Sequence, residues 1–190
     1  MIPASLVEPM KIAADLRLMP VVPAHAEDVF QLVDEDRIRL GARLPWVQHT
    51  LAVTDTEDFI RDSVARRDVH GGGDGSGDWT IEVGTGNQSL IVGMVGIHAP
   101  HWQDRRVTIG YWIAGAHEGR GWITRSVGAV VERLQSLGMH RIEIRARVDN
   151  PRSRAVPERL GFTLEGELRS IEWFEGRAID HAVYSRLATD

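Results

Sequence analysis

The sequence has no cysteine and a single lysine, Lys11, among its 190 residues. Without cysteine, the chain has no disulfide bond, no cysteine-ligated zinc or iron–sulfur site and no thiol nucleophile. With only one lysine, a Schiff-base mechanism is not expected. The 22 basic and 27 acidic residues give a net charge of −5, which argues against non-specific binding of nucleic acid.

Long apolar runs are also missing. The longest one, residues 90–97, is far shorter than the roughly 20 residues that a membrane helix needs. Glu8, Lys11 and Asp15 interrupt the N-terminal segment, and this argues against a signal peptide. We therefore expect a cytoplasmic protein with no membrane partner.

The length and a hydrophobic content of 43% suit one globular domain over residues 1–190. Residues 1–14 are expected to form an N-terminal extension. The glycine-rich stretch at residues 70–78 is typical of a flexible surface loop.

Apolar spacing and turn residues predict a mixed α/β (α+β) fold. Thr54, followed by Glu57, has the pattern of a capping box and predicts a helix start. Asn150 and Pro151 predict the start of a short helix that ends at Gly161. Further helices are expected at 25–40 and 122–137, turns at 84–87 and 175–176, and strands at 16–21, 78–83, 90–97, 107–113, 141–148, 163–173 and 177–187.

A strand, a glycine loop and a helix start follow one another at residues 109–124. Glycine lets backbone approach a ligand closely, and the first N–H groups of a helix are unpaired and favour an anion. The loop therefore suits a pyrophosphate, to which Arg120 adds one positive charge. An ordinary strand-to-helix turn explains the same glycines. The loop has neither a Walker ending nor the dinucleotide fingerprint.

Four ordered segments of the chain resemble the GNAT superfamily of acyltransferases, and within it the RimJ/RimL branch that acetylates protein N-termini. The resemblance extends from Leu16 to Leu187. It is carried by Glu118-Gly119-Arg120-Gly121-Trp122-Ile123, by Arg147-Val148-Asp149-Asn150-Pro151-Arg152-Ser153, by Arg159-Leu160-Gly161-Phe162-Thr163-Leu164-Glu165-Gly166 and, more weakly, by Leu44-Pro45-Trp46-Val47 with Asp55-Thr56.

The resemblance implies a mixed sheet of about seven strands, splayed in the middle and flanked by about four helices, with acetyl-CoA as acyl donor and no metal. Asn150 and Ser153 would face the pantetheine and the thioester. Backbone groups of Tyr111, Trp112 and Ile113 would pair with the pantetheine arm. The pyrophosphate would lie on the segment made of Glu118, Gly119, Arg120, Gly121, Trp122, Ile123 and Thr124.

Three residues depart from the family pattern. Glu118 stands in place of glutamine or arginine, and a carboxylate near a pyrophosphate is unfavourable unless it faces solvent or pairs with an arginine such as Arg120. Ile123 replaces a small residue. Pro157 lies inside the helix after Asn150, where it frees a carbonyl, so we expect that helix to kink or to start late.

The resemblance implies two catalytic residues. Glu172 matches the position of a glutamate that acts through water as a base, and partial burial beside aromatic residues would raise its pKa. It equally fits a solvent-facing strand position. Ser153 matches the group that serves the leaving thiolate, although a serine near a helix N-terminus also fits a role toward the backbone.

Candidate acceptor-binding residues are Asp34, Arg37 and Trp46. Asp34 and Arg37 also fit a solvated helix face, and Trp46 also fits the core. His98, His101 and His117 lack metal-ligand spacing, so no metal site is expected.

The resulting hypothesis is transfer of an acetyl group from acetyl-CoA to a primary amine by direct attack. The favoured acceptor is the N-terminal α-amine of a protein or peptide, possibly ribosomal, because an α-amine loses its proton more easily than a lysine. The alternatives are a small amine such as a polyamine, an amino-sugar or an antibiotic, succinyl-CoA as donor, or a non-catalytic acyl-CoA-binding protein. The branch implies a homodimer.

Overall fold

The computed structural model describes residues 6–85 and 89–190. It contains one eight-stranded sheet in the order β1-β2-β3-β4-β5-β6-β8-β7, in which only β5 and β6 pair in parallel. This arrangement confirms the expected mixed α/β fold. The strands are β1 (Met10–Lys11), β2 (Leu16–Pro20), β3 (Gly77–Val83), β4 (Leu90–His101), β5 (Arg106–Ile113), β6 (Arg141–Arg147), β7 (Thr163–Phe174) and β8 (Arg177–Leu187).

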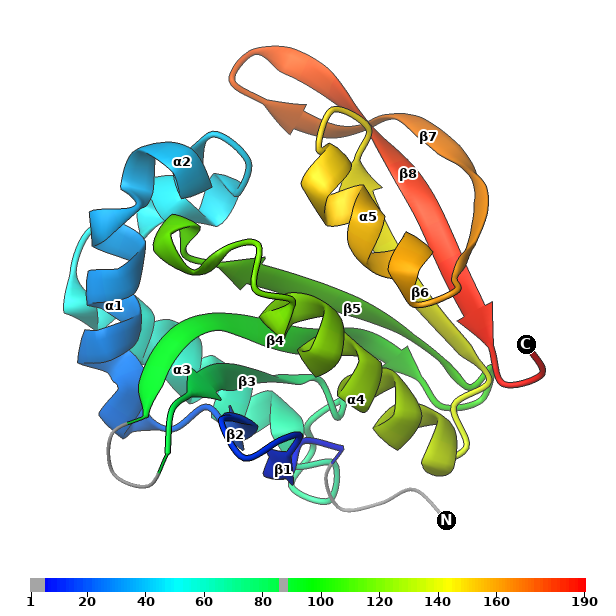
Figure 1. Cartoon of the computed structure of the whole chain (residues 1–190), viewed down its shortest axis with the longest axis horizontal. Helices are drawn as coiled ribbons and strands as arrows, with labels where there is room; N and C mark the ends of the chain where they lie inside the picture. The colour runs from blue at the N-terminus through cyan, green and yellow to red at the C-terminus, as the bar shows by residue number, and fades with distance from the viewer. Residues whose placement is uncertain (1–5, 86–88) are drawn as a thin grey trace.

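Helices cover both faces of the sheet (Figure 1). One face carries α4 (Trp122–Ser136) and α5 (Pro151–Arg159), and the other carries α1 (Ala26–Glu35), α2 (Arg37–Gly41) and α3 (Val53–Arg67). Short 3-10 turns are η1 (Pro23–His25), η2 (Pro45–His49) and η3 (Gly115–His117). The main core packs α4 against β2 to β6, with Val127, Val130 and Leu134 fully buried, as the apolar spacing of that helix predicts.

The sheet opens in its middle. β5 and β6 pair from Arg106 with Arg141 to Ile109 with Ile144, and beyond these residues the two strands separate. We call this point the fork, and we call β6, β8 and β7 together the arm. Figure 1 shows the arm leaning away from β5 above α4. The fork is the splay that the family resemblance implied, and it leaves one edge of β5 without a strand partner from Gly110 onward.

Two expected helices differ in detail from the structure. The helix expected at 25–40 is divided at Asp36, which ends α1 and whose carboxylate accepts a hydrogen bond from the Gly115 N–H at 2.7 Å. The capping box of Thr54 and Glu57 is not formed. Instead Ala52 is the N-cap, and the Asp55 carboxylate accepts from the backbone N–H groups of Leu51 and Ala52, because it reaches both unpaired donors.

The N-terminal and loop segments differ from expectation as well. Residues 6–14 contribute β1, an eighth strand that the sequence did not predict, and Leu6 is fully buried in the core. The end of the glycine-rich stretch, Gly77 and Asp78, belongs to β3. The turn expected at 84–87 lies partly outside the described residues. The turn at Glu175 and Gly176 is confirmed between β7 and β8.

Candidate active site

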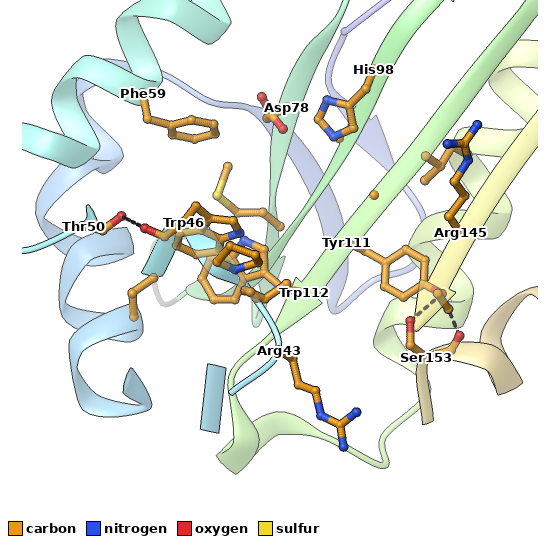
Figure 2. Close-up of a pocket in the computed structure, with 18 of the residues that line it drawn as sticks. Arg43, Trp46, Thr50, Phe59, Asp78, His98, Tyr111, Trp112, Arg145 and Ser153 are labelled. Carbon is orange, nitrogen blue, oxygen red and sulfur yellow. Dashed lines mark hydrogen bonds between the residues drawn. The ribbon is translucent and has the colours of Figure 1, made fainter. Parts of the chain in front are cut away.

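A cavity of about 580 Å³ lies at the fork. Its walls come from α1, the η2 segment, α3, the floor of β3 to β5, and the arm (Figure 2). The volume lies within the range of pockets that bind small ligands. The lining includes Val29, Val33, Arg43, Trp46, Thr56, Phe59, Asp78, Met94, Gly96, His98, Gly110, Tyr111, Trp112, Arg145, Arg147, Asn150, Ser153, Glu172 and His181.

An aromatic pair forms the middle of this cavity. The ring centroids of Trp46 and Trp112 are 5.8 Å apart with planes tilted by 54°. Arg37 holds the wall that carries Trp46, because its guanidinium donates to the backbone carbonyls of Val47 at 2.9 Å and Thr50 at 2.7 Å. Trp46 therefore lines the cavity, whereas Arg37 and its ion-pair partner Asp34 do not.

The glycine loop opens α4 with its backbone exposed. Gly119 and Gly121 both have φ of +76°, a conformation that favours glycine. Gly121 is the N-cap and offers no side chain to the first amides of α4, so these N–H groups are available to an anion. Arg120 lies over the Trp122 ring, with Cζ 5.1 Å from its centroid.

Glu118 pairs with two arginines from opposite sides of the loop. Its Oε1 accepts from Arg39 Nη1 of α2 at 2.7 Å, and its Oε2 pairs with Arg152 of α5. Arg120, the partner considered from the sequence, donates weakly to the Ala116 carbonyl instead. Two guanidinium groups thus neutralise the carboxylate that departs from the family pattern.

The end of β5 is held from α2. Arg39 Nη2 donates to the Ile113 carbonyl at 2.6 Å, and the same guanidinium binds Asp36. The hydrogen bonds from Arg39 and from the Gly115 N–H lower the pKa of Asp36 against the opposing effect of its burial. Of the three β5 residues expected to pair with pantetheine, Ile113 therefore already has its carbonyl bonded to protein.

Ser153 and Asn150 meet Tyr111 at the fork. Asn150 Oδ1 caps α5 by accepting from the Ser153 N–H at 3.2 Å. The Tyr111 hydroxyl donates to the Ser153 carbonyl at 2.8 Å and lies 3.4 Å from Ser153 Oγ (Figure 2). Burial raises the pKa of Tyr111, so its phenol stays protonated. This contact was not predictable from sequence patterns, because 42 residues separate the partners.

Glu172 lies in the arm wall with both oxygens paired. Oε1 binds the buried guanidinium of Arg147, and Oε2 is 2.7 Å from His181 Nε2. Burial acts to raise its pKa, but hydrogen bonds from Arg147 and His181 outweigh it and the pKa is lowered. The expectation of a raised pKa is wrong for this reason, while a role for Glu172 as base stays a prediction.

Several polar residues of the cavity were not identified as site residues from the sequence, and three of them lie together on the side of β3, β4 and α3. They are Asp78, 6% exposed, Thr56, 3% exposed, and His98. Within residues 6–85 and 89–190, Thr56 Oγ1 has no hydrogen-bond partner. The glycines at 96 and 110, inside strands, were the available signal of a close approach there.

Residues 6–85 and 89–190 contain no cluster of three or more side chains suited to a metal ion. They also contain no helix with the length and apolar character needed to cross a membrane.

Comparisons with known proteins agree with this geometry. Residues 15–163 match the family described as “Acetyltransferase (GNAT) domain”. Over 183 residues the chain is 26% identical to the “Ribosomal-protein-serine acetyltransferase” of Escherichia coli (strain K12), covering 96% of this chain and 98% of that protein.

Solved structures show the same fold. The structure of RimL, “Ribosomal L7/L12 alpha-N-protein acetyltransferase in complex with Coenzyme A”, has a TM-score of 0.86 at 26% identity and covers 95% of this chain and 98% of that one. The microcin C7 self-immunity acetyltransferase MccE, solved with acetyl-CoA and AMP, has a TM-score of 0.85 at 24% identity and covers 97% of each chain.

Proposed function

Because the chain belongs to the GNAT acetyltransferase family, we propose that it transfers the acetyl group of acetyl-CoA to the N-terminal α-amine of a protein or peptide. The observation that carries the proposal is the fork, with the open helix end of α4 beside it and the cavity that lies at it. These three features offer a place for a thioester arm, for a diphosphate and for an amine.

The residues around the fork fit acetyl-CoA. The N–H groups of α4 after Gly121 suit the diphosphate, and the unpaired edge of β5 at Tyr111 and Trp112 suits the pantetheine amides. Glu118 is compatible with this site because Arg39 and Arg152 neutralise it. When bound, acetyl-CoA supplies an acyl carbon activated as a thioester.

The chain's own groups then serve the transfer. The neutral amine attacks the acyl carbon and the C–N bond forms. The C–S bond breaks and the thiolate leaves. Ser153 Oγ, beside the Tyr111 hydroxyl, would hydrogen-bond the leaving sulfur. The carboxylate of Glu172 would attract the incoming ammonium group before it loses its proton. No covalent enzyme intermediate is required.

Two observations bear on the acceptor. The Escherichia coli relative is named for a ribosomal-protein serine. This name supports a protein as acceptor of the acetyl group, with a ribosomal protein among the candidates. The cavity with its Trp46 and Trp112 pair has the size for a small aromatic amine as well, so a small-molecule acceptor is the second candidate.

We also propose a homodimer in the cytoplasm, where acetyl-CoA and new protein N-termini occur together. The support is an exposed edge: β7 lies at the end of the sheet, and its apolar side chains Leu168, Ile171 and Trp173 are exposed, Trp173 to 74%. Such an edge invites pairing with another strand. Light scattering after size exclusion tests the dimer.

The first experiment is calorimetry with acetyl-CoA, succinyl-CoA and free CoA, followed by an acceptor panel. The panel holds peptides with a free N-terminus, the same peptides with a blocked N-terminus and an internal lysine, and polyamines, amino-sugars and aminonucleosides. Release of free thiol reports turnover without background, since the protein has no cysteine.

Micromolar binding of acetyl-CoA with turnover of only the free N-terminal peptides is the expected result. Turnover of the small amines alone would establish the second candidate. Tighter binding and faster turnover of succinyl-CoA would change the donor. Binding without turnover of any acceptor would favour an acyl-CoA-binding protein, and failure to bind any CoA would contradict the proposal.

A further inference from the structure

The cavity floor contains two glycines that lie side by side on neighbouring strands, with Asp78 next to them on a third strand. Asp78 of β3 pairs in register with Gly96 of β4, and Gly96 pairs with Gly110 of β5. Cross-strand partners project to the same face of a sheet. The Asp78 side chain therefore lies on the face where Gly96 and Gly110 carry none. Glycine inside a strand weakens that strand and often marks a place where another group approaches the backbone closely.

The space above these glycines is taken by His98 and Asp78. A Cβ placed on Gly96 would lie 3.1 Å from His98 Nε2 and 2.2 Å from Asp78 Oδ1, and a Cβ placed on Gly110 would lie 3.1 Å from the same His98 Nε2. The imidazole therefore lies on the glycine pair, with its Nε2 edge over both. Figure 2 shows Asp78 and His98 side by side at one end of the cavity.

This position brings His98 to the fork. Gly110 directly follows Ile109, the last residue of β5 that pairs with β6. His98 Nε2 is thus next to the place where the strands separate and where, on the proposed function, the thioester carbon lies. His98 is exposed and lines the cavity, so a bound amine can reach it.

The Asp78 side chain is held in place near that imidazole, without an ion pair or hydrogen bond between the two described side chains. Its carboxylate is buried, and Oδ2 accepts from Ser63 Oγ of α3 at 2.8 Å. Burial raises the pKa of Asp78, while the charges of His98, Arg66 and Arg67 and the Ser63 hydrogen bond act to lower it. The remaining charged or titratable groups of the cavity wall are Arg43, Asp55, Tyr111, Arg145, Arg147, Glu172 and His181.

Most of these other groups already form ion pairs or hydrogen bonds within the protein. Arg147 and His181 pair with Glu172, Arg145 pairs with Glu143, and Arg43 pairs with Asp149. Asp55 caps α3. A carboxylate held on both oxygens, as Glu172 is, accepts a proton reluctantly. An imidazole has a pKa near 6.5 and suits proton transfer from an α-ammonium group far better.

We propose that His98 is the residue that takes the proton from the acceptor amine, and that Asp78 is its positioning residue. The inference rests on the proposed acetyl transfer. As the amine nitrogen forms its bond to the acyl carbon, one N–H proton passes to His98 Nε2 and the C–S bond electrons leave with the thiolate. The Asp78 carboxylate stabilises the imidazolium until the proton returns to solvent or to the thiolate.

The test uses His98→Gln and Asp78→Asn, with His101→Gln as the matched control because His101 also lies on β4 but outside the cavity. Glu172→Gln tests the alternative that Glu172, and not His98, accepts the proton. Measurements are kcat against pH with the acceptor found in the panel, acetyl-CoA affinity by calorimetry, and the His98 imidazole pKa by NMR in the free protein. Exogenous imidazole is added to His98→Ala.

We expect His98→Gln to lower kcat by about 100-fold, to remove the acidic limb of the pH profile and to leave acetyl-CoA affinity within about twofold. Asp78→Asn removes a nearby negative charge and moves the limb to lower pH. Imidazole restores activity to His98→Ala, which a structural role would not explain. His101→Gln behaves as wild type.

Three results would overturn the inference. The first is an unchanged limb in His98→Gln, the second is loss of the limb only in Glu172→Gln, and the third is a His98 pKa that Asp78→Asn does not move. If the wild-type protein acetylates nothing in the panel, the proposed function fails separately. The NMR titration then still decides whether Asp78 and His98 form a unit.

Discussion

The Tyr111 hydroxyl donates a hydrogen bond to the Ser153 carbonyl at 2.8 Å, across the fork from β5 to α5. Ser153 is four residues before Pro157, which has no N–H, so this carbonyl lacks its helical donor. The late helix start expected from Pro157 does not occur, since α5 begins at Pro151. The hydroxyl of a tyrosine from β5 replaces the missing donor.

Tyr111→Phe should destabilise the protein by about 1–3 kcal/mol, because it leaves the Ser153 carbonyl without a partner. It should also lower kcat, since Ser153 loses the contact that fixes it. Urea unfolding measures the first effect. The matched background is Pro157→Ala, which restores a helical N–H to Ser153. The same Tyr111→Phe change should cost clearly less there, and an equal cost in both backgrounds would contradict the assigned pairing.

Glu118→Gln should tighten acetyl-CoA binding about fivefold, for an electrostatic change on the order of 1 kcal/mol. The substitution removes a negative charge beside the diphosphate site and releases Arg152 toward that anion. Arg39 stays in place through Asp36. Calorimetry at low and high salt measures the change, with Glu132→Gln on exposed α4 surface as control. Weaker binding would mean that the Glu118 pairs preform the site.

Glu172→Gln should lower turnover with little change in acetyl-CoA affinity. Its carboxylate lies in the acceptor cavity, and its loss leaves the buried Arg147 without a counter-charge. Steady-state kinetics should show the loss with the acidic limb of the pH profile retained. Unchanged turnover would show that Glu172 has no part in the reaction. Loss of the acidic limb of the pH profile would show that Glu172 is the base.

The arm should lose stability in acid through Glu165. Hydrogen bonds from Arg141 and from Ser185 lower the pKa of Glu165 from 4.5 to about 2. A carboxylate with a lowered folded pKa stabilises the fold above its unfolded pKa, and this contribution is lost as the pH falls from 4.5 toward 2. Thermal melts of Glu165→Gln should show a shallower loss across that window than wild type, and parallel curves would contradict the assignment.

Much of the fold follows from local patterns. The apolar spacing of α4, the Asn150 cap of α5 and the β7–β8 turn were all predictable, because each depends on neighbours within a few residues. The break at Asp36 was not predictable, since its carboxylate is held by Gly115, 79 residues away. The same holds for β1, a two-residue strand with no pattern of its own.

The sequence by itself determined the family and the glycine loop before α4, and it singled out Ser153, Glu172 and Trp46, which line the cavity. These depend on the order of residues along the chain. Only the tertiary structure decided the chemistry around them. It paired Glu118 with Arg39 and Arg152, lowered the pKa of Glu172 through Arg147 and His181, and placed His98 on two glycines beside Asp78. Charge and burial at a site come from strands and helices far apart in the chain, and local sequence does not carry them.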